Sequence, residues 1–227
     1  MDSPGACVDL VTTLSACAAS ACAYRLAYQA LRLVGPRDVA RTSREAGCLH
    51  AAALVALGVL WGRGMDRGVW VLAARAASVG FLLHDTHLIC THPALWDLSY
   101  LCHHGLVIPL VLYGSAFYPA ETALSFYAET TVAPLYLGRL MVAGGWEARR
   151  PWLFRLNAAL LLVLYLRFRV YGLTAVAWGL RGDPVVAPML FAFALLNYYW
   201  FFFLCMRVAR GPRPTGRGSS AADGAGE

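Results

Sequence analysis

Long apolar runs separated by short polar segments make up most of this chain of 227 residues. A helix rises about 1.5 Å per residue, so about 20 apolar residues cross a hydrocarbon layer about 30 Å thick. The second of these runs is shorter than this, and its helix could begin earlier, within the polar segment before it. The pattern predicts seven membrane-spanning helices, at residues 8–34, 46–61, 69–90, 96–113, 124–142, 152–178 and 185–208.

The composition supports an all-α integral membrane protein. Hydrophobic residues account for 59% of the chain and charged residues for 14%, whereas soluble domains carry about 25% charged residues. In such a protein the net charge of +6 reports membrane topology more often than nucleic-acid binding, so we expect no nucleic-acid partner. The seven cysteines show no C-x-x-C motif and no metal-ligand spacing. We therefore expect no disulfide and no metal site.

Arginines outside the apolar runs predict the orientation of the chain. Most of them lie in segments 35–45 and 143–151 and in the C-terminal tail, and seven helices put these three segments on one side of the membrane. The positive-inside rule then places the C-terminus in the cytosol and the N-terminus in the lumen. The tail, residues 210–227, is rich in glycine, proline, serine and arginine, which is typical of disordered segments.

Five of the six histidines lie in one stretch, from Phe81 to His104. A charged or imidazole group at hydrocarbon depth costs several kcal/mol unless it lines a cavity or has a partner, so this density indicates function. The adjacent His103 and His104 could act as a general base or as an acyl-accepting nucleophile. Asp85 and Glu129 are the candidate acids that would orient them. The alternative is that both histidines only pack at a helix interface.

A metal site is a further interpretation of the same stretch. His84 and His87 are three residues apart and share a helix face, while Asp85 points about 100° away, toward a neighbouring helix. Together with the adjacent histidine pair they superficially resemble the histidine boxes of di-iron membrane hydroxylases. Those sites need more histidines than the six present here, and the isolated His50 is expected to be a packing histidine. A di-iron lipid hydroxylase is therefore the less favoured alternative.

Several short motifs occur in a fixed order along the chain. They are Ser43 to His50 and Ala51, Phe81 with His84, Asp85 and Thr86, His103 with His104, Ala128 and Glu129 followed by Leu137, Gly138 and Arg139, Leu153 to Asn157, Phe168 with Arg169, and Asn197 with Tyr199, Trp200 and Phe201. In this order, over about residues 40–208, the chain resembles the TLC-domain membrane proteins, which include the ceramide synthases. It is most similar to their small, ceramide-synthase-like family 3.

The resemblance implies a domain organisation. One helix, within residues 1–37 and after a short polar start, would precede a TLC domain at residues 38–209, and a cytosolic tail would follow at 210–227. The TLC domain would be a six-helix barrel that opens toward the cytosol. The resemblance also implies a multi-pass protein of the endoplasmic reticulum or Golgi.

The resemblance further implies roles for individual residues. Paired histidines in ceramide synthases transfer an acyl group from acyl-CoA to a sphingoid amine, so His103 and His104 would be acyl acceptor and base. With Asp85 and Glu129 they form the candidate catalytic set. The expected substrate-pocket residues are His84, His87, Arg139, Asn157, Arg169, Asn197 and Trp200.

The expected partners follow from this reading. They are membrane lipids, with acyl-CoA as co-substrate, a sphingoid base as acceptor and no bound cofactor, and the sequence leaves a homodimer open. The paired aspartates that follow the histidines in ceramide synthases are represented here by Glu129 alone. A non-catalytic protein for lipid binding, lipid homeostasis or cargo handling is therefore the main alternative to an acyltransferase.

Overall fold

The computed structural model describes residues 10–34 and 38–210, and every regular element within these ranges is a helix. The polar start and residues 211–227 of the expected tail lie outside the described residues, and Arg210 is the last residue of the final helix. The elements are α1 (Leu10–Leu33), α2 (Val39–Gly62), α3 (Arg67–Thr91), the 3-10 helix η1 (Pro93–Leu95), α4 (Leu98–Phe117), α5 (Pro119–Phe126), the 3-10 helix η2 (Tyr127–Thr131), α6 (Val132–Ala143), α7 (Trp146–Arg149), α8 (Pro151–Leu164), the π-helix η3 (Tyr165–Gly172), α9 (Leu173–Gly179) and α10 (Val186–Arg210).

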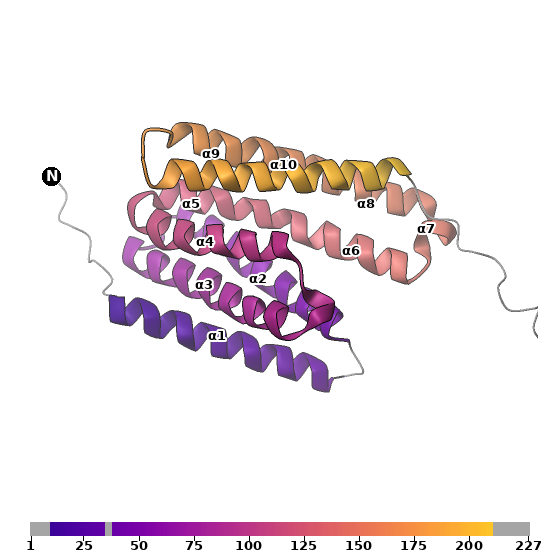
Figure 1. The fold of residues 1–227 in the computed structure, drawn as a ribbon, viewed down its shortest axis with the longest axis horizontal. Coiled ribbons are helices and arrows are strands. Elements are labelled where there is room, and N and C mark those ends of the chain that lie inside the picture. The colour runs from indigo at the N-terminus through magenta and orange to yellow at the C-terminus, as the bar shows by residue number, and fades with distance from the viewer. Residues whose placement is uncertain (1–9, 35–37, 211–227) are drawn as a thin grey trace, which may run out of the picture.

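The long segments lie side by side and reverse direction at each connection (Figure 1). The α5–η2–α6 elements follow one another as one continuous helical segment, and so do the α8–η3–α9 elements. We call one end of the bundle the basic end. There α1, α3, α6 and α10 finish, and α2, α4 and α8 begin. The end where α9 is joined to α10 is the opposite end.

The all-α, multi-pass membrane class is confirmed. Within the described residues, five helical stretches are long and apolar enough to cross a membrane: Leu10–Leu33, Val39–Gly62, Leu98–Phe117, Pro151–Gly179 and Val186–Ala209. The remaining two expected spans differ from these. α3 has the length but carries Arg75, Asp85 and two histidines, and the α5–η2–α6 segment is divided into short helices. A total of seven spans stays a prediction.

The second helix begins within the polar segment before its apolar run, as its short predicted length allowed. The structure begins α2 at Val39 instead of residue 46, so most of the expected basic loop is helical. Asp38 is the N-cap, and its carboxylate accepts a hydrogen bond of 2.6 Å from the Arg41 amide. An ion pair of 3.1 Å between Arg41 and Glu45 adds support one turn later. The N-cap and the ion pair thus stabilise helical turns of α2 that precede its apolar run, and apolar periodicity does not predict these turns.

Two further expected spans have irregular interiors. The fifth is interrupted by the 3-10 helix η2, and the sixth contains the π-helix η3. A π segment adds residues to a turn and so rotates every later side chain about the helix axis. The short polar connection expected near residue 146 contains the four-residue helix α7.

An apolar cluster fills part of the interior toward the opposite end. Trp70 is fully buried there, and its ring packs at 4.9 Å from that of Trp61 and at 5.9 Å from that of Phe126. Its indole N–H donates to the Leu57 carbonyl at 2.9 Å, so the one polar atom of this ring is satisfied. The polar side chains of the candidate site lie instead toward the basic end and the middle of the bundle.

α3 is joined closely to α1. A Cβ atom at Gly80 would lie 2.5 Å from the Cβ of Ser20 and 3.0 Å from the Ala21 amide nitrogen, so only glycine permits this approach. Nearby, the Arg75 guanidinium donates to Thr13 at 3.2 Å on α1 and to the Leu112 carbonyl at 2.9 Å on α4. Close backbone contact and a shared arginine thus hold α1 against the rest of the bundle.

Asp183 fixes the connection between α9 and α10. Its carboxylate accepts hydrogen bonds of 2.8 Å from the Val185 and Val186 amides and one of 2.6 Å from the Tyr118 hydroxyl, between α4 and α5. The hydrogen bond from Tyr118 is the largest cause that lowers the pKa of the Asp183 carboxyl. The same bond raises the pKa of Tyr118 to about 12.

Gly80→Ala is expected to destabilise the protein. Overpacking costs about 1–3 kcal/mol and outweighs the gain of up to about 1 kcal/mol that alanine has over glycine inside a helix. The measurement is the melting temperature in detergent. Gly105→Ala is the matched control, because a Cβ there meets nothing within 4 Å; it should leave the melting temperature equal or higher. Equal increases in both variants would contradict the close α1–α3 contact.

Tyr118→Phe is expected to lower the melting temperature at neutral pH, because Asp183 loses its shortest hydrogen bond. The folded-state pKa of Asp183 lies below its ordinary value of 3.8, so its stabilisation is fully present above that value and is lost as the pH falls through the lower folded pKa. The difference between wild type and Tyr118→Phe should therefore shrink below this pH. Tyr171→Phe, at an exposed tyrosine, should show no such difference, and a gap that persists in acid would refute the assignment.

Candidate functional site

His104 lies at a junction of α3 and α4. The residue is 4% exposed, and its Nδ1 lies 2.7 Å from the Thr86 hydroxyl oxygen. Its Nε2 lies 3.5 Å from a carboxylate oxygen of Asp85. Both ring nitrogens therefore face polar groups of α3, which hold the imidazole in one orientation.

Asp85 extends this junction to a third helix. Its other carboxylate oxygen accepts a hydrogen bond of 3.0 Å from the Ser43 hydroxyl on α2. The expectation that Asp85 would turn toward a neighbouring helix and lie beside one of the paired histidines agrees with this geometry. A carboxylate next to an imidazole orients the ring and stabilises the imidazolium, as a catalytic base requires.

His103 faces a different neighbour from His104. Its ring packs at 5.2 Å from that of Phe193 and at 5.5 Å from that of Trp200, both on α10. The two histidine rings are 5.6 Å apart. The Nδ1 atom of His103 is buried and has no hydrogen-bond partner among the described residues. Trp200 is held by a hydrogen bond of 3.2 Å from its indole nitrogen to the Ser99 hydroxyl.

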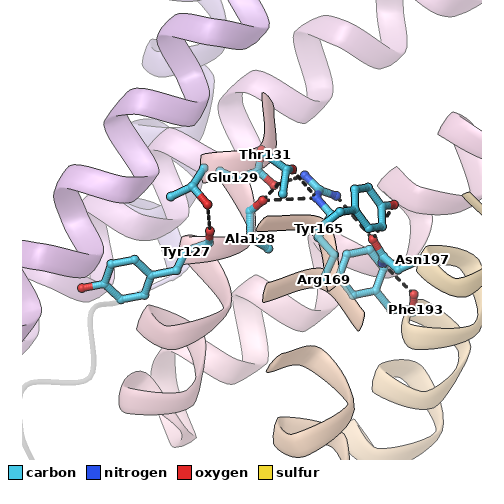
Figure 2. Close-up of polar contacts among 9 residues, drawn as sticks. Tyr127, Ala128, Glu129, Thr131, Tyr165, Arg169, Phe193 and Asn197 are labelled. Carbon is cyan, nitrogen blue, oxygen red and sulfur yellow. Dashed lines mark hydrogen bonds and ion pairs between the residues drawn. The ribbon is translucent and has the colours of Figure 1, made fainter. Parts of the chain in front are cut away.

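Arg169 forms a second polar junction in the middle of the bundle (Figure 2). It projects from η3 and is 8% exposed. Its guanidinium pairs with Glu129 at 2.9 Å and donates to the Thr131 hydroxyl at 2.8 Å, both on η2. On the other side it reaches Asn197 Oδ1 on α10 at 3.4 Å, and the Tyr165 hydroxyl donates to the same oxygen at 3.3 Å. The expected pocket residues Arg169 and Asn197 are thus brought together.

The expected role of Glu129 as acid partner of the paired histidines needs correction. The structure pairs this carboxylate with Arg169, since both project from irregular helices that pack against each other. A full positive charge at 2.9 Å is a stronger partner than an imidazole, so Glu129 neutralises the buried guanidinium. Asp85 is the carboxylate that lies beside His104.

His84 and His87 do not join the paired histidines. They lie on the face of α3 that meets α1, where the His84 ring contacts the Tyr28 ring edge-on at 5.6 Å. Gly80, His84 and His87 follow the i, i+4, i+7 spacing of one helix face. The close approach at Gly80 therefore carries both histidines toward α1.

The other expected pocket residues have separate positions. Asn157 is 6% exposed and donates to the Pro134 carbonyl at 2.9 Å, which ties α8 to α6. Arg139 lies on α6 and is half-buried. His50, expected to be a packing histidine, is buried and stacks on Phe81 at 4.1 Å, and its Nδ1 lies 3.3 Å from the Tyr24 hydroxyl.

Ser43 and Thr86 are the site residues that sequence reasoning missed. Both were part of the motifs but received no role. A hydroxyl on a spanning helix is no signal on its own, because it can bond to its own backbone. The only available signal was that Thr86 directly follows Asp85.

The positions of the histidine side chains do not favour the di-iron interpretation. The His103 and His104 rings lie 5.6 Å apart, whereas the His84 ring contacts Tyr28 of α1 and is separate from that pair. Among the described residues, no group of three or more histidine, cysteine, aspartate or glutamate side chains could hold a metal ion.

Comparisons with known proteins add no further constraint on the site. No protein-family model, curated protein or solved structure matches the chain. The TLC resemblance therefore stays a proposal.

Arg169→Met is expected to destabilise the protein by about 3 kcal/mol or more, because it leaves the Glu129 carboxylate without its cation inside the bundle. The double variant Arg169→Met/Glu129→Leu removes both charges and should recover much of this loss. Unfolding in mixed detergent measures the three free energies. Arg167→Met is the control, since Arg167 lies on the same π-helix and is exposed. Equal losses in the single and double variants would show that the pair is not coupled.

Proposed function

We propose that this chain is a TLC-type membrane protein that handles an acyl lipid at His103 and His104. Its reaction would be the transfer of an acyl group from acyl-CoA to a sphingoid amine. One observation carries this proposal. His104 is held between the Thr86 hydroxyl and the Asp85 carboxylate, while a buried ring nitrogen of the adjacent His103 has no hydrogen-bond partner in the described part of the chain. An oriented imidazole beside a free one is an arrangement suited to proton and acyl transfer.

The two histidines would have different roles in this reaction. His103 is the reacting group, because its Nδ1 has no partner among the described residues. As the amine nitrogen attacks the thioester carbonyl, His103 takes the proton from that nitrogen. The carbon–sulfur bond breaks, and the departing thiolate receives the proton as a free thiol. The His104 ring lies 5.6 Å from the His103 ring, and Asp85 lies beside His104. Both groups would stabilise the positive charge that His103 acquires.

A narrow apolar crevice lies next to this pair. It runs between α4, α5, α9 and α10, and Phe193 lines it and also packs on the His103 ring. Its volume is about 60 Å³, the space of about two water molecules. An acyl chain would enter only if Phe193 turns or if α4 and α10 separate.

The polar junction at His104 also supports a second candidate function, in which the chain binds lipid without reacting. Lipid binding needs a cavity but no reacting imidazole, so the crevice would have to widen in this function as well. In this alternative the His104–Asp85 junction holds α2, α3 and α4 together, and the chain serves lipid homeostasis or cargo handling.

The same proposal includes a topology. α1 would be the preceding helix, and the segments from α2 to α10 would form the six-helix barrel, which gives seven spans in total. Exposed arginines at the basic end are Arg32, Arg41, Arg149, Arg150, Arg155 and Arg207. At the opposite end, Arg63, Arg67 and Arg181 are balanced by Asp66, Glu121 and Asp183. The positive-inside rule supports a cytosolic basic end, and an endoplasmic reticulum or Golgi location follows from the family resemblance.

Purified protein in lipid vesicles, supplied with acyl-CoA of several chain lengths and a sphingoid base, is expected to form the N-acyl amide. His103→Ala and His104→Ala should each lower the rate by about 100-fold or more, the usual worth of a general base. Asp85→Asn keeps the shape of the side chain and should also slow the reaction. Product is measured by mass spectrometry.

Cys102→Ala is the control on the same helix, since Cys102 is exposed and one residue from the pair. Its rate should equal that of wild type. Melting temperatures of all variants separate loss of chemistry from loss of folding. A folded wild type that forms no amide at any chain length, beside an active ceramide synthase, would favour the binding function. Full activity in both histidine variants would exclude the proposed site.

A further inference from the structure

A polar pocket separate from the His104 junction lies between α1 and α3, on the face of α3 that points away from His104. Its volume is about 570 Å³, and it opens near the basic end, where both helices finish. Two arginines of α1, Arg25 and Arg32, line it together with His84, His87 and His92. No aspartate or glutamate is among its lining residues. The pocket is therefore strongly electropositive.

Two buried polar atoms at this pocket lack partners. Tyr28 and His84 are each 5% exposed, and both line the pocket. Neither the Tyr28 hydroxyl nor the His84 Nε2 has a hydrogen-bond partner among the described residues. Leaving two such atoms unpaired in a protein interior is costly, and a ligand that bonds to them would remove that cost.

The position of Arg25 supports the same conclusion. It lies eight residues before the end of α1, which corresponds to a depth of about 12 Å. An exposed arginine at this depth on a helix that crosses a membrane is stabilised by an anionic partner, by a water-filled cavity or by extending its side chain to the interface. The negative ends of the α1 and α3 dipoles act mainly within the last turn, so they do not neutralise Arg25.

We propose that this pocket binds a phosphate group, carried by the headgroup of an anionic membrane lipid or by a water-soluble phosphate ester. Arginine guanidinium groups match the oxygens of phosphate in a two-pronged geometry. The Tyr28 hydroxyl and the histidine rings supply further donors. A metal cation is disfavoured by the two arginines, and a carboxylate has fewer oxygens than this set of donors can use.

The setting favours a lipid as the source of the phosphate. Basic pockets between membrane helices at the interface are a recurring way to bind anionic headgroups. The pocket reaches from the end of the bundle to about 12 Å inside it, which spans a headgroup layer of about 5–7 Å and continues into the region of the acyl chains. A phosphate site here would stand whether or not the paired histidines transfer acyl groups, since it shares no residue with them.

The test compares two lipids that differ only in phosphate. Wild-type protein in detergent is titrated with dioleoyl phosphatidic acid or with dioleoylglycerol, and bound lipid is counted by native mass spectrometry. Phosphatidic acid should bind about tenfold or more tightly. Glycerol 3-phosphate forms the third arm. Binding of this soluble ester as tightly as of phosphatidic acid would support the site and assign it to a water-soluble ligand.

Two variants test the residues. Arg25→Gln/Arg32→Gln should weaken phosphatidic acid binding about tenfold or more. Arg155→Gln/Arg207→Gln removes the same charge from exposed positions at the same end and should leave binding unchanged. Tyr28→Phe removes one hydroxyl without changing charge and should weaken binding several-fold.

Three results would overturn the proposal. The first is equal binding of the two lipids, and the second is an equal loss of affinity in the two double-arginine variants. The third is an unchanged affinity in both Tyr28→Phe and Arg25→Gln/Arg32→Gln, measured separately. Melting temperatures confirm that each variant is folded before its affinity is interpreted.

Discussion

A charged or imidazole side chain inside a membrane bundle has a low energy only if its partners also lie inside the bundle. The described residues meet this constraint at three junctions. Arg75 joins α3 to α1 and α4, Asp85 joins α3 to α2 and α4, and Arg169 joins η3 to η2 and α10. Because each junction draws on three segments, these polar side chains help to select which helices become neighbours.

α3 has the central place in this arrangement because different faces of it meet different neighbours. Gly80 opens one face to α1, and the histidines that follow at helical spacing are carried toward the same neighbour. Asp85 and Thr86 lie on another face and meet α2 and α4. One helix therefore separates two polar regions that are continuous in the sequence, the His104 junction and the pocket beside α1.

The adjacent histidines show the same effect of helix geometry. Neighbouring residues on a helix point about 100° apart, so His103 and His104 meet different neighbours. His104 meets the carboxylate of Asp85, and His103 meets the aromatic rings of α10. The carbonyl of Phe193, which packs on His103, also accepts the Asn197 amide, so His103 lies between the Asp85 junction and the Arg169 junction. Acyl transfer and lipid binding would both depend on this shared position.

The sequence by itself determined the membrane class, the approximate position of most helices and the stretch that holds most of the polar chemistry. These features follow from local composition and run length, which do not depend on what a helix packs against. The proximity of Asp85 and His104 was also foreseeable, because they flank one short connection and Asp85 had to turn away from its neighbouring histidines.

Only the tertiary structure decided which polar groups meet. Spanning helices are apolar on most faces, so their sequences carry little information on how each helix is rotated. Glu129 therefore looked like a partner of the histidines until the 3-10 and π segments turned it and Arg169 toward each other. His84 and His87 were assigned to the same pocket as His104, although Gly80 directs them to α1. Rotation and close approach depend on contacts between distant segments, and no local pattern records them.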